Sequence, residues 1–277
     1  DNTIFRWINV KFRNKTFDKI MPIITSAGNL GIVWIIISVL LMTKQDYRVF
    51  GQMILMALII TTILGEGIIK HIVKRKRPFY GDSDKELLIS RPITYSFPSG
   101  HTASSFAVAA VFIETDNAAS LEIILLASLI AFSRIYLGVH YPKDVIVGAI
   151  LGVLTAWICY KLYIRIENKM LLYLITFVLF LPALTFAHSA DFIKGLGTYF
   201  GFLIGMFVEK KYVNFSVEGT RVNKIIRVLI GVLILLILQT GLKVILPTGQ
   251  IFAFIRYAVI SFFGIGIYPI IFKKFKI

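Results

Sequence analysis

The pattern of apolar and polar positions along the chain consists of long apolar runs separated by short polar connections. Nine of these runs approach the length of ~20 residues that an α-helix needs to cross a bilayer. The third and the seventh run are the shortest. The pattern predicts an all-α fold, a polytopic transmembrane helical bundle with about nine spans, at residues 20–42, 51–69, 99–113, 119–137, 145–164, 170–187, 192–208, 225–245 and 251–272.

The N-terminal stretch has a different pattern. Residues 3–19 mix Phe, Trp, Ile and Val with five basic residues, which is typical of an amphipathic helix lying in the membrane interface. The start of the chain lacks the pattern of a cleavable signal peptide. We therefore expect three parts, an interfacial amphipathic helix at 1–19, a transmembrane core at 20–167 and additional C-terminal transmembrane helices at 168–277.

Composition supports a membrane protein and limits the classes of function. Hydrophobic residues make up 57% of the chain and charged residues 16%, whereas soluble domains carry roughly a quarter charged residues. The net charge of +15 comes from basic residues scattered among the connections, as is typical of loops beside anionic headgroups. We expect the lipid bilayer, and no nucleic acid, as a partner. The single cysteine, Cys159, excludes a disulfide or cysteine-based metal site within one chain.

The stretch SFPSGHTASS, residues 96–105, stands at the start of the third apolar run. Pro98 fits the first turn of a helix, where its missing N–H would have no partner. The N–H groups that follow, near Ser99 and Gly100, would then point out of the helix end and form an anion site. His101 would move protons there near neutral pH. The stretch therefore predicts a site for an anion that reacts.

A strongly basic connection follows the second run. Lys70 lies at the end of that run, and Arg77 and Pro78 follow after six intervening residues. For each basic residue alone, a solvated flank of the membrane is a sufficient explanation. The Arg-Pro step is more specific, because proline stiffens the backbone beside a side chain suited to bidentate phosphate binding.

A third polar cluster follows the fourth run. Arg134 lies on its last turn, and His140 and Asp144 come six and ten residues later. A carboxylate that holds one imidazole nitrogen fixes the tautomer and leaves the other nitrogen free to attack. Alternating topology brings all three clusters to the same side of the membrane, which predicts one shared site.

These three clusters together resemble the three-part signature of the type 2 phosphatidic-acid phosphatase superfamily, in its order and with its spacings. The resemblance covers roughly the first 165 residues, so the core at 20–167 is the expected catalytic part. Residues 170–277 have no counterpart in the compact members of that family. These extra spans are candidates for a groove that binds a lipid chain or for the surface of a homo-oligomer.

The resemblance implies a role for each motif residue. His140 is the implied nucleophile, Asp144 orients it and stabilises its charge, and His101 is the implied general acid and base. The implied phosphate ligands are Lys70, Arg77, Ser99, Gly100 and Arg134. Three cations around one phosphate neutralise the charge of phosphoryl transfer without a metal, so we expect no cofactor and activity that resists EDTA.

Glu66 lies four residues before Lys70, on the same face of the helix and one turn deeper. Acidic residues inside a membrane are costly and usually paired. Two interpretations remain open for Glu66, a positioning role that orients Lys70 and a role in packing of the span.

The distribution of basic residues indicates the orientation. When the basic residues of the two motif loops are set aside as phosphate ligands and their neighbours, the face opposite the site carries more Lys and Arg. The positive-inside rule then places that face in the cytoplasm and the site on the outer side of a cell membrane.

Three functions compete. The first is hydrolysis of a phosphorylated membrane lipid such as a polyprenyl diphosphate, phosphatidylglycerol phosphate, phosphatidic acid or a sphingoid-base phosphate. The second is a phosphotransferase in which an acceptor hydroxyl replaces water, and the third is binding or transport of a lipid phosphate without turnover. The pair of His140 and Asp144 argues against the third, because binding phosphate needs cations only. Vanadate-dependent haloperoxidases have a related fold but are soluble.

Overall fold

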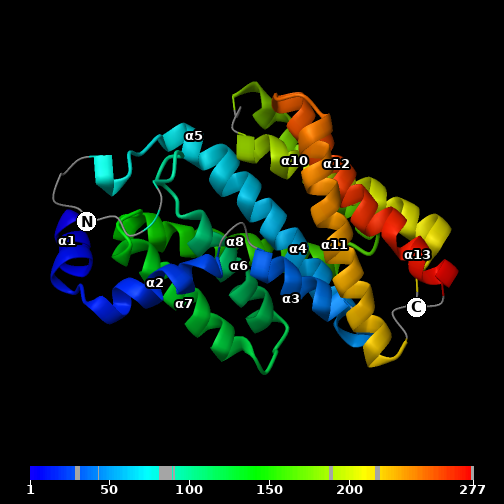
Figure 1. Ribbon diagram of the computed structural model, residues 1–277, viewed down its shortest axis with the longest axis horizontal. Helices are drawn as coiled ribbons and strands as arrows, with labels where there is room; N and C mark the ends of the chain where they lie inside the picture. The colour runs from blue at the N-terminus through cyan, green and yellow to red at the C-terminus, as the bar shows by residue number, and fades with distance from the viewer. Residues whose placement is uncertain are drawn as a thin grey trace. The chain divides into compact units, whose positions relative to one another are not determined.

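The computed structural model describes residues 1–28, 32–42, 44–80, 89, 91–186, 190–215 and 219–275. These residues form helices and irregular connections, with no strand among them (Figure 1), so the predicted all-α fold is confirmed. The helices are α1 (Asn2–Arg6), α2 (Lys15–Ser26), α3 (Ile32–Met42), α4 (Arg48–Thr62), α5 (Lys70–Val73), α6 (Gly100–Glu114), α7 (Ser120–Tyr136), α8 (Pro142–Arg165), α9 (Lys169–Phe180), α10 (Ala190–Val208), α11 (Arg221–Ile245), α12 (Gln250–Phe262) and α13 (Tyr268–Phe275).

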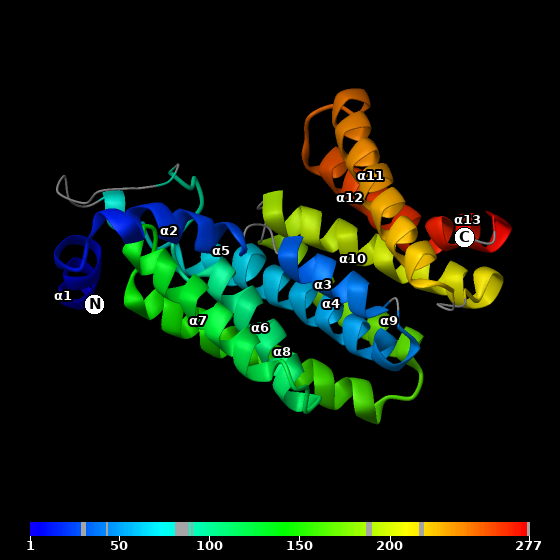
Figure 2. The ribbon, with the colours of Figure 1, turned by 60° about the horizontal axis from the view of Figure 1, so that its bottom comes forward.

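The chain forms two compact units. The first consists of Asp1–Ser38 and Met53–Lys161, and the second of Val39–Gln52 and Leu162–Ile277. In the first unit α6, α7 and α8 lie side by side (Figures 1 and 2). In the second unit α10 packs along α12.

Small residues allow close packing of the helices in both units. In α8, Gly148 and Gly152 face α6, and a Cβ atom built on Gly152 would lie 2.1 Å from the carbonyl oxygen of Ala103. A Cβ atom on Gly148 would lie 2.7 Å from the carbonyl oxygen of Ser99. This spacing of two glycines is typical of helices that pack closely in membranes. It holds the start of α6 directly against α8.

Five helical stretches among the described residues are long and apolar enough to cross a membrane. They are Arg48–Tyr80, Pro142–Arg165, Phe192–Val213, Arg221–Ile245 and Gln250–Lys274. Arg221–Ile245 combines a mean hydropathy of 2.5 with a window that the protein does not bury at all, as expected of a helix surrounded by lipid. The chain is therefore an integral membrane protein. The predicted count of nine spans is not confirmed and stays a prediction.

The N-terminal stretch forms two helical pieces rather than the single helix predicted over 1–19. The first piece, α1 with its π-helical continuation Trp7–Lys11, ends before Asn14, whose side chain caps α2. Phe5 and Ile8 are buried in a cluster with residues at the end of α7. Part of the apolar surface of the first piece thus packs on protein, whereas Ile4, Trp7 and Val10 are exposed. A position in the membrane interface stays a prediction. The apolar run predicted at 20–42 likewise contains two helices, α2 and α3.

The stretch between α4 and α5 winds as a π-helix over Ile63–Ile69. Such wide turns within α-helices occur frequently at functional sites. This one carries Glu66 and ends directly before Lys70, which begins α5.

Candidate active site

The start of α6 forms one wall of the candidate site. Ser99 is the N-cap residue and Gly100 the first helical residue, so Pro98 precedes the cap and does not lie in the first turn as predicted. The backbone N–H of Ser99 donates to the carbonyl of Asp144 at 2.9 Å, and its hydroxyl accepts from Thr102 at 2.9 Å. The first N–H groups of a helix have no partner within the helix. This end of α6 is therefore suited to an anion.

Arg77 and His140 meet in the interior of the first unit. The Nη1 atom of Arg77 lies 3.1 Å from Nε2 of His140 and donates to the carbonyl of Val139 at 2.9 Å. Thr94 holds the other side of the guanidinium, since its carbonyl accepts from Nε at 2.7 Å and its hydroxyl from Nη2 at 3.0 Å. Both Arg77 and His140 are almost fully buried. The Nε2 atom of His140 thus faces a guanidinium that Thr94 and Val139 hold in place.

Asp144 is fully buried and lies on the first turn of α8. Its Oδ1 atom accepts from Nη1 of Arg75 at 2.7 Å, and its Oδ2 atom accepts from the backbone N–H of Tyr141 at 2.9 Å. The same Oδ2 atom lies 3.7 Å from Nδ1 of His140. This separation exceeds a hydrogen bond, and Nδ1 has no hydrogen-bond partner.

Arg75 connects Asp144 to a second carboxylate. Its Nη2 atom lies 2.6 Å from Oδ2 of Asp1, and its guanidinium lies over the ring of Tyr141 at 4.2 Å from the centroid. A guanidinium bound on two edges and one face has little freedom. Arg75 therefore fixes the position of the Asp144 carboxylate.

Arg134 and His101 lie opposite the end of α2. Arg134 is 4% exposed, and its Nη1 atom donates to the hydroxyl of Thr25 at 2.7 Å, while its Nε atom has no hydrogen-bond partner. A Cβ atom built on Gly28 would lie 2.9 Å from Cδ2 of His101. The imidazole of His101 therefore packs against the backbone of Gly28.

Glu66 and Lys70 form an ion pair of 2.7 Å. The ammonium group also lies 3.5 Å from the hydroxyl of Thr94, which connects Lys70 to the Arg77 guanidinium. A Cβ atom built on Gly100 would lie 1.9 Å from Oε1 of Glu66. The Glu66 carboxylate therefore rests against the first residue of α6, and any side chain at position 100 would displace it.

Charge and burial set the state of His140. Burial, followed by the charges of Arg77, Arg134, Lys70 and His101, lowers the pKa of His140 well below its usual range. The imidazole is therefore neutral at neutral pH. A neutral imidazole with its proton on Nδ1, toward Asp144, has a lone pair on Nε2, as a nucleophile requires. In the structure this lone pair accepts from Nη1 of Arg77.

The structure thus brings predicted site residues from three segments together. Glu66 contacts Lys70 and Gly100, Arg77 contacts His140, and Ser99 binds the backbone of Asp144. Among the described residues, no three His, Cys, Asp or Glu side chains lie close enough to hold a metal ion.

Sequence analysis missed three polar residues of the site, Thr25, Arg75 and Thr94. Arg75 is one of several basic residues in the connection after Lys70, and its position two residues before Arg77 places both side chains on the same connection. Thr25 and Thr94 stand in segments without a motif, and no signal in the sequence distinguishes them from other threonines.

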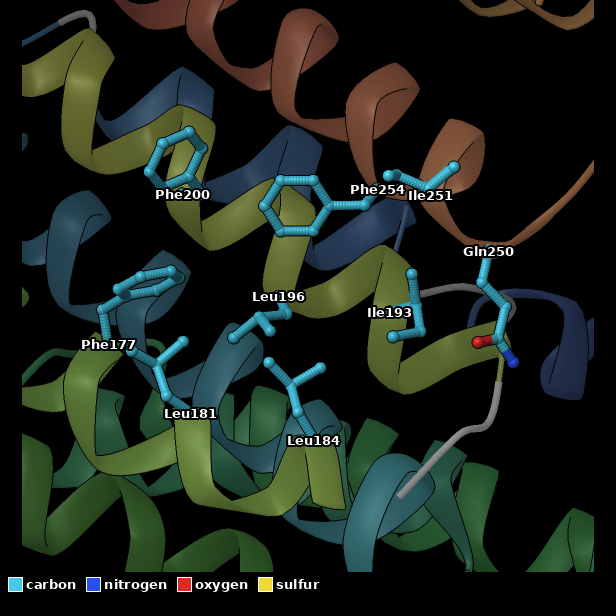
Figure 3. A pocket seen from close by; sticks show the side chains of 9 residues that line it. All are labelled: Phe177, Leu181, Leu184, Ile193, Leu196, Phe200, Gln250, Ile251 and Phe254. Carbon is cyan, nitrogen blue, oxygen red and sulfur yellow. The ribbon is translucent and has the colours of Figure 1, made fainter. Parts of the chain in front are cut away.

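A groove in the second unit contains none of these groups. It has a volume of about 360 Å³ and is lined by Phe177, Leu181, Leu184, Ile193, Leu196, Phe200, Gln250, Ile251 and Phe254 (Figure 3). Gln250 is its one polar side chain. A second groove of about 490 Å³ shares Phe177 and Phe200 with it. Both are apolar and offer no reactive group.

Comparisons with known proteins agree with this geometry. A family model described as PAP2 superfamily matches residues 51–167, and a second, described as PAP2 superfamily phosphatase, transmembrane extension, matches residues 193–277. An undecaprenyl-diphosphatase of Sulfolobus acidocaldarius is 34% identical over 167 residues, which cover 60% of this chain and 77% of that relative.

Two further relatives extend the comparison. A decaprenylphosphoryl-5-phosphoribose phosphatase of Mycolicibacterium smegmatis is 38% identical over 81 residues, covering 29% of this chain and 43% of that protein. The crystal structure of Aquifex aeolicus LpxE superposes with a TM-score of 0.51 at 29% identity and covers 58% of this chain and 94% of that one. The resemblance carried by the three motifs is thereby confirmed, and this chain belongs to the PAP2 superfamily of phosphatases.

Proposed function

We propose that this protein is a membrane lipid phosphatase that hydrolyses a phosphomonoester or diphosphate through a phosphohistidine intermediate. The observation that carries the proposal is the contact of 3.1 Å between Nε2 of the neutral His140 and the guanidinium of Arg77. The proposed nucleophile, His140, and a proposed phosphate ligand, Arg77, are therefore in direct contact. The N-terminus of α6 belongs to the same site. Polyprenyl diphosphate is the first substrate to test, because an undecaprenyl-diphosphatase shares 34% identity with the chain.

Binding of the phosphoryl group uses the three cations. Phosphoryl transfer depends mainly on positioning and on neutralising charge that spreads over the equatorial oxygens. The guanidinium of Arg77 is held by Thr94 and presents Nη1 toward the nucleophile. Arg134 has an unpaired Nε–H, and the Ser99 hydroxyl and the Gly100 N–H add donors.

In the first step, Nε2 of His140 forms a bond to phosphorus while the bond from phosphorus to the lipid oxygen breaks. This step requires His101 in its protonated form, which gives its proton to the leaving oxygen and becomes neutral, so the lipid departs as an alcohol or a monophosphate. The Nδ1 proton of the resulting phosphohistidine faces Asp144, whose negative charge stabilises the cationic imidazole.

In the second step, His101 takes a proton from water, and the water oxygen attacks phosphorus. The bond between phosphorus and Nε2 breaks, inorganic phosphate leaves, and both histidines return to their initial states. One group serves as acid and then as base in such two-step reactions. These steps need no metal ion, so the activity is proposed to persist in EDTA.

The positive-inside pattern supports a site on the outer side of the cell membrane. For residues 168–277, the two candidate roles are a groove for a hydrocarbon chain and a surface for a second copy of the chain. The apolar lining of the groove in Figure 3 favours the first.

The phosphotransferase remains the alternative enzyme, since an acceptor hydroxyl could replace water in the second step. Release of inorganic phosphate by purified protein in detergent tests the proposal, with polyprenyl diphosphate, phosphatidylglycerol phosphate, phosphatidic acid and sphingosine phosphate as substrates. We expect release from one lipid class by the wild type and none by His140→Ala. Release that appears only with an added alcohol would favour the transferase, and no turnover under either condition would contradict both enzymes.

A further inference from the structure

The C-terminal turn of α2 contacts two of the predicted site residues, although it lies outside the matched residues 51–167. Thr25 binds Arg134, and Gly28 packs against His101. The N–H of Gly28 donates to the carbonyl of Thr25 at 3.0 Å. Both contacts therefore come from one hydrogen-bonded turn.

The contact between Thr25 and Arg134 is buried on both sides. Thr25 is 3% exposed and Arg134 is 4% exposed, and the hydroxyl accepts from Nη1 at 2.7 Å. A guanidinium carries five N–H donors in a fixed plane, so one short bond restricts the direction of the others. Because branching at Cβ restricts χ1 of threonine and Thr25 is buried, the acceptor has few alternative positions. The Nε–H without a partner is then held in a defined direction.

The contact between Gly28 and His101 depends on the missing side chain. A Cβ atom at position 28 would lie 2.9 Å from Cδ2 and 3.4 Å from Cβ of His101, and 3.1 Å from Cγ2 of Ile130. The ring could not stay in place beside such an atom. Gly28 therefore defines where the imidazole stands.

We propose that the turn Thr25–Gly28 is a positioning element of the active site, in which Thr25 aims Arg134 at the phosphoryl group and Gly28 sets the ring of His101. This inference rests on the proposed function, because it assigns separate parts of that reaction to the two contacts. Thr25 acts on phosphate binding, and Gly28 acts on proton transfer during turnover.

The first test measures binding of inorganic phosphate to the purified full chain in detergent by calorimetry. Thr25→Val removes the hydroxyl and preserves the shape, and we expect it to raise the Kd about tenfold, as loss of a charge-assisted hydrogen bond implies. Thr25→Ser restores the acceptor and is expected within twofold of the wild type. Thr155→Val is the matched control, because Thr155 is 5% exposed and its hydroxyl donates to the carbonyl of Leu151 at 2.7 Å, on a different helix.

A merely structural role of Thr25 would lower the fraction of folded protein without changing the Kd of the molecules that bind. If Thr25→Val does not fold, Thr25→Ala supplies the same measurement. An unchanged Kd in a folded variant without the hydroxyl, or a Thr25→Ser variant as weak as Thr25→Val, would overturn the role of Thr25.

The second test separates Gly28 from Thr25 by turnover. We expect Gly28→Ala to lower kcat at least tenfold on the lipid that the wild type hydrolyses, with a phosphate Kd within twofold of the wild type. Equal kcat values would overturn the role of Gly28. A wild type that binds phosphate but hydrolyses no lipid would contradict the proposed function instead, and the Kd of Thr25→Val would still decide the role of Thr25.

Discussion

The Nδ1 atom of His140 lies 3.7 Å from Oδ2 of Asp144, which is too far for a hydrogen bond, although both residues are buried. Arg75 accounts for the distance, because it binds the other carboxylate oxygen at 2.7 Å. Arg75 thus holds the carboxylate near the imidazole. In the proposed reaction, attack on phosphorus makes the imidazole of His140 cationic. The positive charge then favours a closer approach of Nδ1 to the Asp144 carboxylate.

Asp144→Asn tests this relationship. The amide keeps the size of the side chain but lacks the charge that stabilises a cationic phosphohistidine, so we expect kcat to fall at least about 100-fold. Labelling with a radioactive phosphoryl donor, quenched in alkaline detergent because the P–N bond of phosphohistidine is labile in acid, measures the intermediate. Arg75→Lys is the companion variant, since one ammonium group cannot bind Asp144 and Asp1 in the same geometry, and a smaller loss of about tenfold is expected. Full activity of Asp144→Asn would contradict the role given to the carboxylate.

Glu66→Gln separates the two interpretations of Glu66. The carboxylate binds Lys70 at 2.7 Å and rests against Gly100, so loss of its charge leaves the ammonium without its fixed direction. We expect kcat/KM to fall about fivefold to tenfold while the melting temperature changes little. A large loss of thermal stability with unchanged kinetics of the remaining folded protein would instead assign Glu66 to packing.

The three motifs could be located from sequence because each combines unusual residue types at fixed spacing beside an apolar run. Alternation of spans was sufficient to predict that Lys70, Ser99 and Arg134 share one end of the bundle. The distances between Asp144, His140 and Arg75 could not be predicted in this way, because sequence spacing does not show which cation binds a carboxylate. Arg75 stands among Lys74, Lys76 and Arg77, so its charge alone does not distinguish it.

For the N-terminal stretch, the sequence could not predict what the apolar residues contact. Its mixture of apolar and basic positions is the same whether the apolar face meets lipid or protein. The structure buries Phe5 and Ile8 against the end of α7, and Asn9, fully buried, donates to the carbonyl of Tyr136 at 2.7 Å. Only these tertiary contacts distinguish an apolar face that meets protein from one that meets lipid. Likewise, only the contact with Arg134 distinguishes Thr25 from other threonines.

Removal of metal ions tests the proposed chemistry directly. Three cationic side chains are assigned to the phosphoryl oxygens, so we expect phosphate release to be unchanged within twofold after dialysis against EDTA. Addition of Mg²⁺ to the dialysed protein is the control for substrate effects, because divalent ions also bind diphosphates. A loss of activity in EDTA that Mg²⁺ restores would contradict the metal-independent mechanism.

Gly152→Ala tests the close packing of α8 on α6. The new Cβ atom would lie 2.1 Å from the carbonyl oxygen of Ala103 and 2.8 Å from the N atom of Ala107, so the helices must separate. Overpacking of this kind costs about 1–3 kcal/mol, and we expect a lower melting temperature in detergent together with lower activity. Gly241→Ala is the matched control, because nothing lies within 4 Å of its Cβ position. Equal effects of the two variants would refute the packing role.

The protonation state of His140 gives a prediction with a defined sign. Burial and the neighbouring cations lower its pKa well below the usual range, so its imidazole should stay neutral in the ligand-free protein as the pH falls from 8 to about 5.5. Nitrogen NMR of labelled histidines, with the His140 signals identified by their absence in His140→Ala, measures this directly.

The same shift predicts how His140 affects stability. Below about pH 6.5 the unfolded chain binds a proton at this position, whereas the folded protein does not. Its contribution therefore lowers the free energy of unfolding as the pH falls, and His140→Gln should reduce the loss of melting temperature between pH 7 and pH 5.5. An imidazole that titrates near pH 6.5 in the folded protein, or an equal acid dependence in the variant, would show that His140 is accessible to protons and is not held neutral by its surroundings.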